Sequence, residues 1–108
     1  MKYSDEQRIG KILVTGNKLM AFIRDRGLTA EDIMKDETLQ WAITTPLYNI
    51  GEQVYQLSEP YKAAWPDIPW LMIAGLRHRL VHDYESTNWS LICEVVFREL
   101  PELIEKLS

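Results

Sequence analysis

Hydrophobic residues recur at steps of three and four along most of the chain, which is the spacing of amphipathic helices. The first such stripe predicts a helix over residues 5–26, which a capping box of Ser4 and Gln7 would begin and Gly27 would end. The apolar positions of this stripe are Ile9, Ile12, Leu13, Leu19, Met20 and Ile23.

The next stretch predicts a short helix and then a long one. Thr29 is placed to cap a helix over residues 30–35, and a third helix is expected from near Asp36 to about Ser58. Pro46 lies inside the apolar pattern of this third helix. Because proline lacks an N–H and crowds the carbonyl four residues earlier, we expect a kink or break near Thr45.

The middle of the chain is interrupted by prolines. Pro60, Pro66 and Pro69 indicate that residues 59–69 form a connection, in which Trp65 and Trp70 pin the loop to the core. A fourth helix is expected from residue 68 or 69 to residue 81, or one turn further.

The last predicted helix follows a turn over residues 85–88. Thr87 or Asn88 would cap it, and its apolar stripe continues to Leu107, with an interruption at Pro101. No segment alternates strictly between apolar and polar residues, so we expect no strands. The pattern predicts an all-α, up-down bundle of four to five helices in a single domain over residues 1–108.

Composition and charge exclude several classes of function. The chain has 108 residues, of which 46% are apolar, and its net charge of −4 argues against broad attachment to DNA or to an anionic membrane. Cys93 is the single cysteine, which excludes a disulfide framework and a multi-thiolate zinc site. The start is polar, without a signal peptide, and the longest apolar stretch is too short to span a bilayer. We therefore expect a soluble, cytoplasmic domain with no membrane contact.

One basic cluster carries the candidate chemistry: Arg77, His78 and Arg79, with His82 close behind. An arginine fork matches the geometry of a phosphate, and a histidine exchanges a proton near neutral pH. Together they suffice for metal-free RNA cleavage, in which the base takes the proton of a 2′-hydroxyl and that oxygen attacks the adjacent phosphate.

The spacing of Arg77 and His82 raises a geometric question. Residues five apart on a regular helix point about 140° away from each other. Either the helix distorts or ends between them, or two copies of the motif meet across a dimer interface, and a symmetric dimer with a composite site is the simplest solution. Tyr84, seven residues after Arg77, shares its helical face.

The run Arg77-x4-His82-x-Tyr84 resembles the RX4HXY motif of the HepT-like proteins, which are minimal members of the HEPN superfamily. Other landmarks of that family occur in the family order over nearly the whole chain: Gly51-Glu52, Ile68-Pro69-Trp70 and Leu100-Pro101-Glu102-Leu103.

This resemblance implies a HEPN-like homodimer that acts as a metal-independent endoribonuclease, without a cofactor. It further implies the toxin of a toxin–antitoxin pair, whose antitoxin is a MntA-like minimal nucleotidyltransferase. Carried over by position, Arg77 would bind or stabilise the scissile phosphate, His82 would transfer the proton and His78 would assist. Tyr84 would receive AMP from the antitoxin, and the added phosphate would compete for Arg77.

Other interpretations of the same residues remain open. The chain could be a non-catalytic docking and nucleotide-binding partner of a nucleotidyltransferase. His78 and His82, four residues apart, could instead bind a metal ion as part of a hydrolase. Tyr84 could be a packing residue. For Glu52, within an apolar helix, the sequence allows pairing with an arginine or simple exposure.

Overall fold

The computed structural model describes residues 3–82 and 87–108, and for residues 81 and 82 the backbone alone. The described residues form helices and connecting turns, without a strand, which confirms the predicted all-α class. In chain order the elements are α1 (Asp5–Arg26), α2 (Ala30–Lys35), α3 (Glu37–Gln56), α4 (Glu59–Ala63), α5 (Trp70–Ala74), α6 (Leu76–His82), α7 (Trp89–Glu94), the π-helix η2 (Val95–Glu99) and α8 (Leu100–Leu107).

The first two helices have the predicted bounds because their ends are set locally. Ser4 Oγ accepts a hydrogen bond from the Gln7 backbone N–H, and the Gln7 side chain accepts one from the Ser4 backbone N–H. Gly27 ends α1 with a φ of 59°, a left-handed conformation that suits glycine. Thr29 caps α2 through a second capping box.

Helix α3 departs from the prediction at Pro46. The helix is continuous from residue 37 to residue 56, so the expected break is wrong. Ile43 and Leu47, on either side of Pro46, are fully buried. Their burial holds both halves of the helix against the core and offsets the hydrogen bond that proline cannot donate.

The predicted connection over residues 59–69 contains a short helix, α4, that the sequence interpretation missed. The Ser58 side chain accepts a hydrogen bond from the Tyr61 N–H, and Pro60 stands in the first turn, where its missing N–H costs little. Trp70 pins this segment as predicted: it is 8% exposed, and its indole N–H lies 3.0 Å from the Lys62 carbonyl oxygen. Trp65 is 38% exposed, so it does not share that role.

The expected fourth helix is divided into α5 and α6 at Gly75. Glycine has a low helix propensity, and its ψ of −17° here lies closer to the 3-10 conformation than to the α-helix, so the backbone is locally tighter. The expected fifth helix is likewise divided. Asn88 caps α7, and a π-helical turn, η2, directly precedes α8, whose second residue is Pro101. A wider turn makes room for the proline ring beside the carbonyl four residues earlier.

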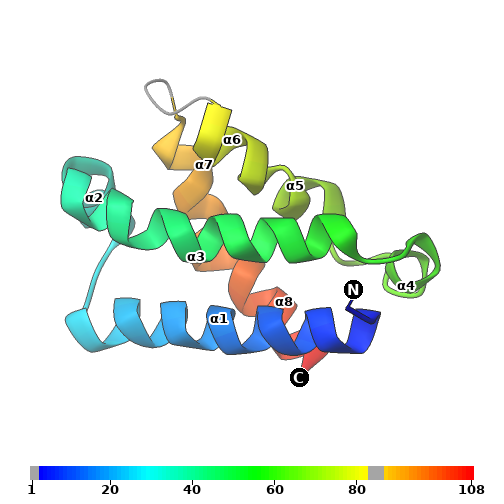
Figure 1. Ribbon diagram of the computed structural model, residues 1–108. Helices are drawn as coiled ribbons and strands as arrows, with labels where there is room; N and C mark the ends of the chain where they lie inside the picture. The colour runs from blue at the N-terminus through cyan, green and yellow to red at the C-terminus, as the bar shows by residue number, and fades with distance from the viewer. Residues whose placement is uncertain (1–2, 83–86) are drawn as a thin grey trace.

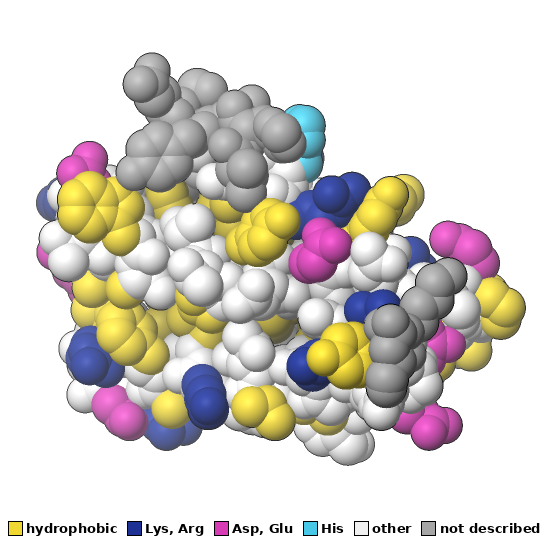
Figure 2. Space-filling model, viewed as in Figure 1, with side chains coloured by type: hydrophobic (Ala, Val, Ile, Leu, Met, Phe, Trp, Pro, Cys, Tyr) yellow, Lys and Arg dark blue, Asp and Glu magenta, His cyan; other side chains and the backbone are white. Residues whose placement is uncertain are grey.

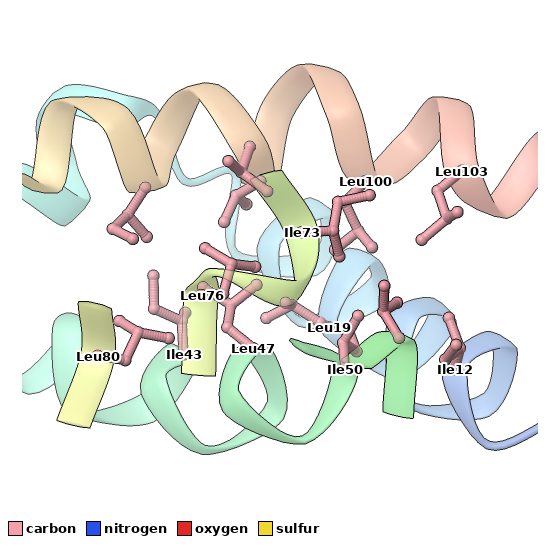
Figure 3. Close-up of a cluster of buried hydrophobic side chains, with 14 of the residues drawn as sticks. Ile12, Leu19, Ile43, Leu47, Ile50, Ile73, Leu76, Leu80, Leu100 and Leu103 are labelled. Carbon is pink, nitrogen blue, oxygen red and sulfur yellow. The ribbon is translucent and has the colours of Figure 1, made fainter. Parts of the chain in front are cut away.

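Helices α1 and α3 run antiparallel beside each other, and α5 and α6 lie along the other side of α3 (Figure 1). The C-terminal segments cross the bundle: α7 contacts α2, and α8 contacts α1. Side chains from α1, α3, α5, α6 and the C-terminal segments converge on one apolar core (Figure 3), and the residues labelled there are Ile12, Leu19, Ile43, Leu47, Ile50, Ile73, Leu76, Leu80, Leu100 and Leu103.

Cys93 belongs to this core. It is 3% exposed, and burial raises the pKa of its thiol, so the thiol stays protonated at neutral pH. Within the described part of the chain, no helix is long and apolar enough to cross a membrane.

Candidate functional site

The candidate site lies where the C-terminal half of α3 meets α5 and α6. Gly51 allows the two backbones to approach closely there. A Cβ atom at position 51 would lie 3.0 Å from both the Arg77 backbone nitrogen and the Ile73 carbonyl oxygen. Because both of these are backbone atoms, a Cβ at this position would require the neighbouring backbone to shift by a few tenths of an ångström, and glycine avoids that shift.

Arg77 follows the start of α6 and extends its side chain over α3. Its guanidinium carbon lies 3.6 Å from the centroid of the Tyr55 ring, the geometry of a cation–π contact. Its Nε lies 3.8 Å from Oε2 of Glu52, and both side chains are 34% exposed. Thus the interpretation of Glu52 as the partner of an arginine is the one that the structure supports.

Glu52 is also held from its own helix. The Gln56 side-chain amide donates to Oε1 of Glu52 at 3.3 Å, while Oε2 faces Arg77. Glu52, Tyr55 and Gln56 are three or four residues apart on α3, so they lie on neighbouring positions of one face. Basic, acidic and hydrophobic side chains meet on this surface between α3 and the α5–α6 segment (Figure 2).

The Arg77 side chain is 34% exposed. Among the residues that the structure describes, Arg77 lies beside Glu52 through Nε and over Tyr55 through its face, and its two terminal nitrogens donate no hydrogen bond to them. These nitrogens make up the outer edge of the guanidinium fork, the edge that binds phosphate oxygens in pairs.

Of the other predicted site residues, the structure describes the side chain of His78 alone. His78 is exposed on α6, directly after Arg77. His82 is the last residue of α6, and its side chain lies outside the described atoms, as does all of Tyr84. The structure therefore places Arg77 and His78 on one short helix, and the predicted roles of His82 and Tyr84 stay predictions.

The backbone shows whether the helix ends between Arg77 and His82. Helix α6 continues from residue 76 to residue 82, so the alternative in which the helix ends between Arg77 and His82 is wrong. A regular helix rotates these two positions about 140° from each other. In the described part of the chain, no three His, Cys, Asp or Glu residues lie close enough together to hold a metal ion.

Tyr55 is the site residue that sequence reasoning missed. A tyrosine on the exposed side of an amphipathic helix carries little signal by itself. Its position three residues after Glu52 was the available indication, since Glu52 was already a possible partner for an arginine.

The family of this chain follows from its similarity to known proteins. The model of the family described as ribonuclease HepT-like matches residues 9–108. The chain therefore belongs to the HepT-like ribonuclease family, as its motif resemblance predicted.

Individual relatives agree with this family. A protein of Caldanaerobacter subterraneus subsp. tengcongensis named "Putative RNase TTE0752" is 38% identical over 85 residues, which cover 79% of this chain and 76% of the relative. "Putative RNase MJ0127" of Methanocaldococcus jannaschii is 31% identical and covers 90% of this chain and 78% of its own. "Probable ribonuclease HepT" of Thermococcus cleftensis is 30% identical over 83 residues, which cover 77% of this chain and 76% of the relative. No solved structure matches the chain significantly.

Proposed function

We propose that this chain is a metal-independent endoribonuclease. The observation that carries the proposal is the guanidinium of Arg77, which contacts Glu52 and Tyr55, donates no hydrogen bond from its terminal nitrogens to the described residues, and lies on the same short helix as His82. Membership in the HepT-like ribonuclease family supports RNA as the substrate.

The proposed reaction uses the RNA's own hydroxyl as the nucleophile. His82 accepts the proton of a 2′-hydroxyl, and the 2′-oxygen then bonds to the adjacent phosphorus. The bond from phosphorus to the 5′-oxygen breaks, that oxygen takes up a proton, and a 2′,3′-cyclic phosphate remains. Arg77 stabilises the extra negative charge on the phosphate in the transition state, and His78 assists from the neighbouring position.

We further propose that two copies of the chain share one cleft. The continuous α6 separates Arg77 from His82 by about 140° around its axis, and a second copy could supply the complementary residue. An apolar surface near the site supports an interface there: Leu71 on α5 is 91% exposed, and the neighbouring Met72 is 38% exposed.

The proposed biological role is that of the toxin in a toxin–antitoxin pair. A MntA-like nucleotidyltransferase would transfer AMP to Tyr84, and the phosphate that it adds would then pair with the open edge of Arg77. This pairing would compete with RNA for the same cation. Modification would therefore block cleavage without any change of fold.

The deciding experiment uses purified protein whose mass shows an unmodified Tyr84. The protein and its His82→Ala variant are incubated with total RNA in EDTA, and circular dichroism checks that both are folded. We expect cleavage by the wild type alone. Equal cleavage by both proteins would contradict the role of His82, and cleavage that needs an added metal ion would contradict the metal-free mechanism.

A composite site is tested by mixing two inactive variants, Arg77→Ala and His82→Ala. If each site takes Arg77 from one copy and His82 from the other, half of the exchanged dimers regain one intact site, and the mixture recovers about a quarter of the wild-type activity. A mixture that stays inactive after subunit exchange would contradict the shared cleft.

A second candidate function is favoured by the acidic charge of the chain. With a net charge of −4, the surface as a whole repels RNA, and the Glu52 carboxylate stands beside Arg77. In this alternative the chain is a docking partner that binds a nucleotide without cutting RNA. ATP or AMP retained by protein that cleaves no RNA would support it.

A further inference from the structure

Two side chains from one turn of α3 contact Arg77 from different directions. Tyr55 covers one face of the planar guanidinium, at 3.6 Å from ring centroid to guanidinium carbon. Glu52 approaches the Nε edge, at 3.8 Å from Oε2. Because one contact lies on a face of the planar group and the other at its Nε, together they restrict both its tilt and its rotation.

Such restriction matters because an arginine side chain is long and has many rotamers. A free guanidinium on the surface would sample many orientations, and few of them would direct its terminal nitrogens at a phosphate. Here the face and the inner edge are occupied, and the outer edge is left for a ligand. Tyr55 is 50% exposed and Glu52 is one-third exposed, so their contacts with Arg77 form at the surface and not inside the core.

We propose that Tyr55 and Glu52 are positioning residues, which hold the Arg77 guanidinium with its outer edge directed at the phosphate of the substrate. Tyr55 sets the plane of the cation, and Glu52, itself held by Gln56, sets its rotation. The inference rests on the proposed function for the identity of the ligand, a phosphodiester of RNA.

The first test compares Tyr55→Leu with Tyr55→Phe in RNA cleavage. Leucine fills similar space but has no ring, whereas phenylalanine retains the ring face that attracts the cation. We expect Tyr55→Leu to lower kcat by about two- to five-fold with KM nearly unchanged, and Tyr55→Phe to stay near wild type. Denaturation midpoints of both variants show whether stability has changed.

The second test reads the orientation of Arg77 without any cleavage. The Nε–Hε group of Arg77 gives an NMR signal, which is assigned as the signal lost in Arg77→Lys. A ring that lies over the guanidinium shifts this signal, so Tyr55→Leu should move it and Tyr55→Phe should not. Glu52→Gln should also move it, because the carboxylate beside Nε is replaced by a neutral amide.

These readouts separate two kinds of failure. An Arg77 signal that is the same in wild type, Tyr55→Leu and Glu52→Gln would overturn the positioning role, whatever the cleavage data show. A signal that responds as expected in a protein that cuts no RNA would contradict the proposed function and leave the positioning of Arg77 intact. Equal loss of kcat in Tyr55→Leu and Tyr55→Phe would contradict the role of the ring face.

Discussion

Two carboxylates of this chain face groups from distant parts of the sequence, and their contacts differ. Asp5, in the first turn of α1, accepts hydrogen bonds from the backbone N–H of Ser58 at 2.9 Å and from its hydroxyl at 2.6 Å. Glu52 faces Arg77 at 3.8 Å, beyond hydrogen-bond distance. The first pair joins α1 to the start of α4, and the second joins α3 to α6.

This difference in hydrogen bonding indicates that the first junction stabilises the fold and that the second positions a cation. The Asp5–Ser58 pair uses both oxygens of the carboxylate, and the backbone and side-chain donors that it needs are supplied by one residue. The Glu52–Arg77 pair restrains a cation and leaves part of its donors open. A partly exposed ion pair of this kind contributes about 0–1 kcal/mol to stability, so its geometry is better explained by ligand binding than by stabilisation.

The largest expected effect is the loss of RNA cleavage when the Arg77 side chain is removed from the junction of α3 and α6. We expect Arg77→Ala to lower the rate of RNA cleavage by about 10²–10³-fold, because one donor to the transition state is lost. The matched control is Arg98→Ala, which removes an exposed arginine that pairs with Glu94 on a different element. Cleavage assays and urea unfolding of both variants would test this, and equal activities would contradict the special role of Arg77.

Gly51 tests the packing at the junction of α3 and α6, and Gly10 on α1 serves as its control. Gly51→Ala should destabilise the fold by about 1–3 kcal/mol, because its Cβ would press on backbone atoms of Ile73 and Arg77. Gly10, on α1, has no atom within 4 Å of such a Cβ, so Gly10→Ala should stabilise by about 0.4–1 kcal/mol. Urea unfolding measures both, and a Gly51→Ala protein as stable as Gly10→Ala would show that the close approach is unnecessary.

The smallest expected effect concerns the pH dependence of the Asp5 junction. The hydrogen bond from the Ser58 hydroxyl, followed by that from its backbone N–H, lowers the pKa of Asp5 below its ordinary value of 3.8. A carboxyl group with a lower pKa in the folded state stabilises the protein above its unfolded pKa, and this contribution is lost as the pH falls through the folded value. Asp5→Asn should therefore be less stable than wild type at neutral pH, and the difference should shrink below about pH 4.

Unfolding free energies at neutral and acidic pH would measure this difference. The pKa of Asp32 is also lowered, chiefly by the backbone N–H of Thr29, but Asp32 is present in both proteins, so its effect cancels. A difference between wild type and Asp5→Asn that does not change with pH would contradict the assignment.

The parts of the fold that follow from neighbouring residues could be predicted from the sequence. The ends of α1 and α2 depend on capping boxes four residues long and on one glycine, so they were predicted to the residue. The cap of α7 by Asn88 is equally local. The motif Arg77-x4-His82-x-Tyr84, together with the other family landmarks along the chain, indicated the HepT-like family, which the family model confirms.

Other features depend on what packs against the chain and could not be predicted in this way. Pro46 would break an isolated helix, but the burial of Ile43 and Leu47 keeps α3 continuous. The division at Gly75 falls within a stripe that predicts one helix, and the interruption expected at Pro101 did not indicate the π-helical turn over residues 95–99.

The sequence by itself thus determined an all-α chain, most of its helix ends and the motif with Arg77, because these depend on residues within one or two turns of each other. The tertiary structure alone decided that Tyr55 and Glu52 lie against Arg77, since α3 and α6 are distant in the sequence and meet only in the folded chain. That packing brings the two backbones close together at Gly51, where a Cβ atom would lie 3.0 Å from two backbone atoms.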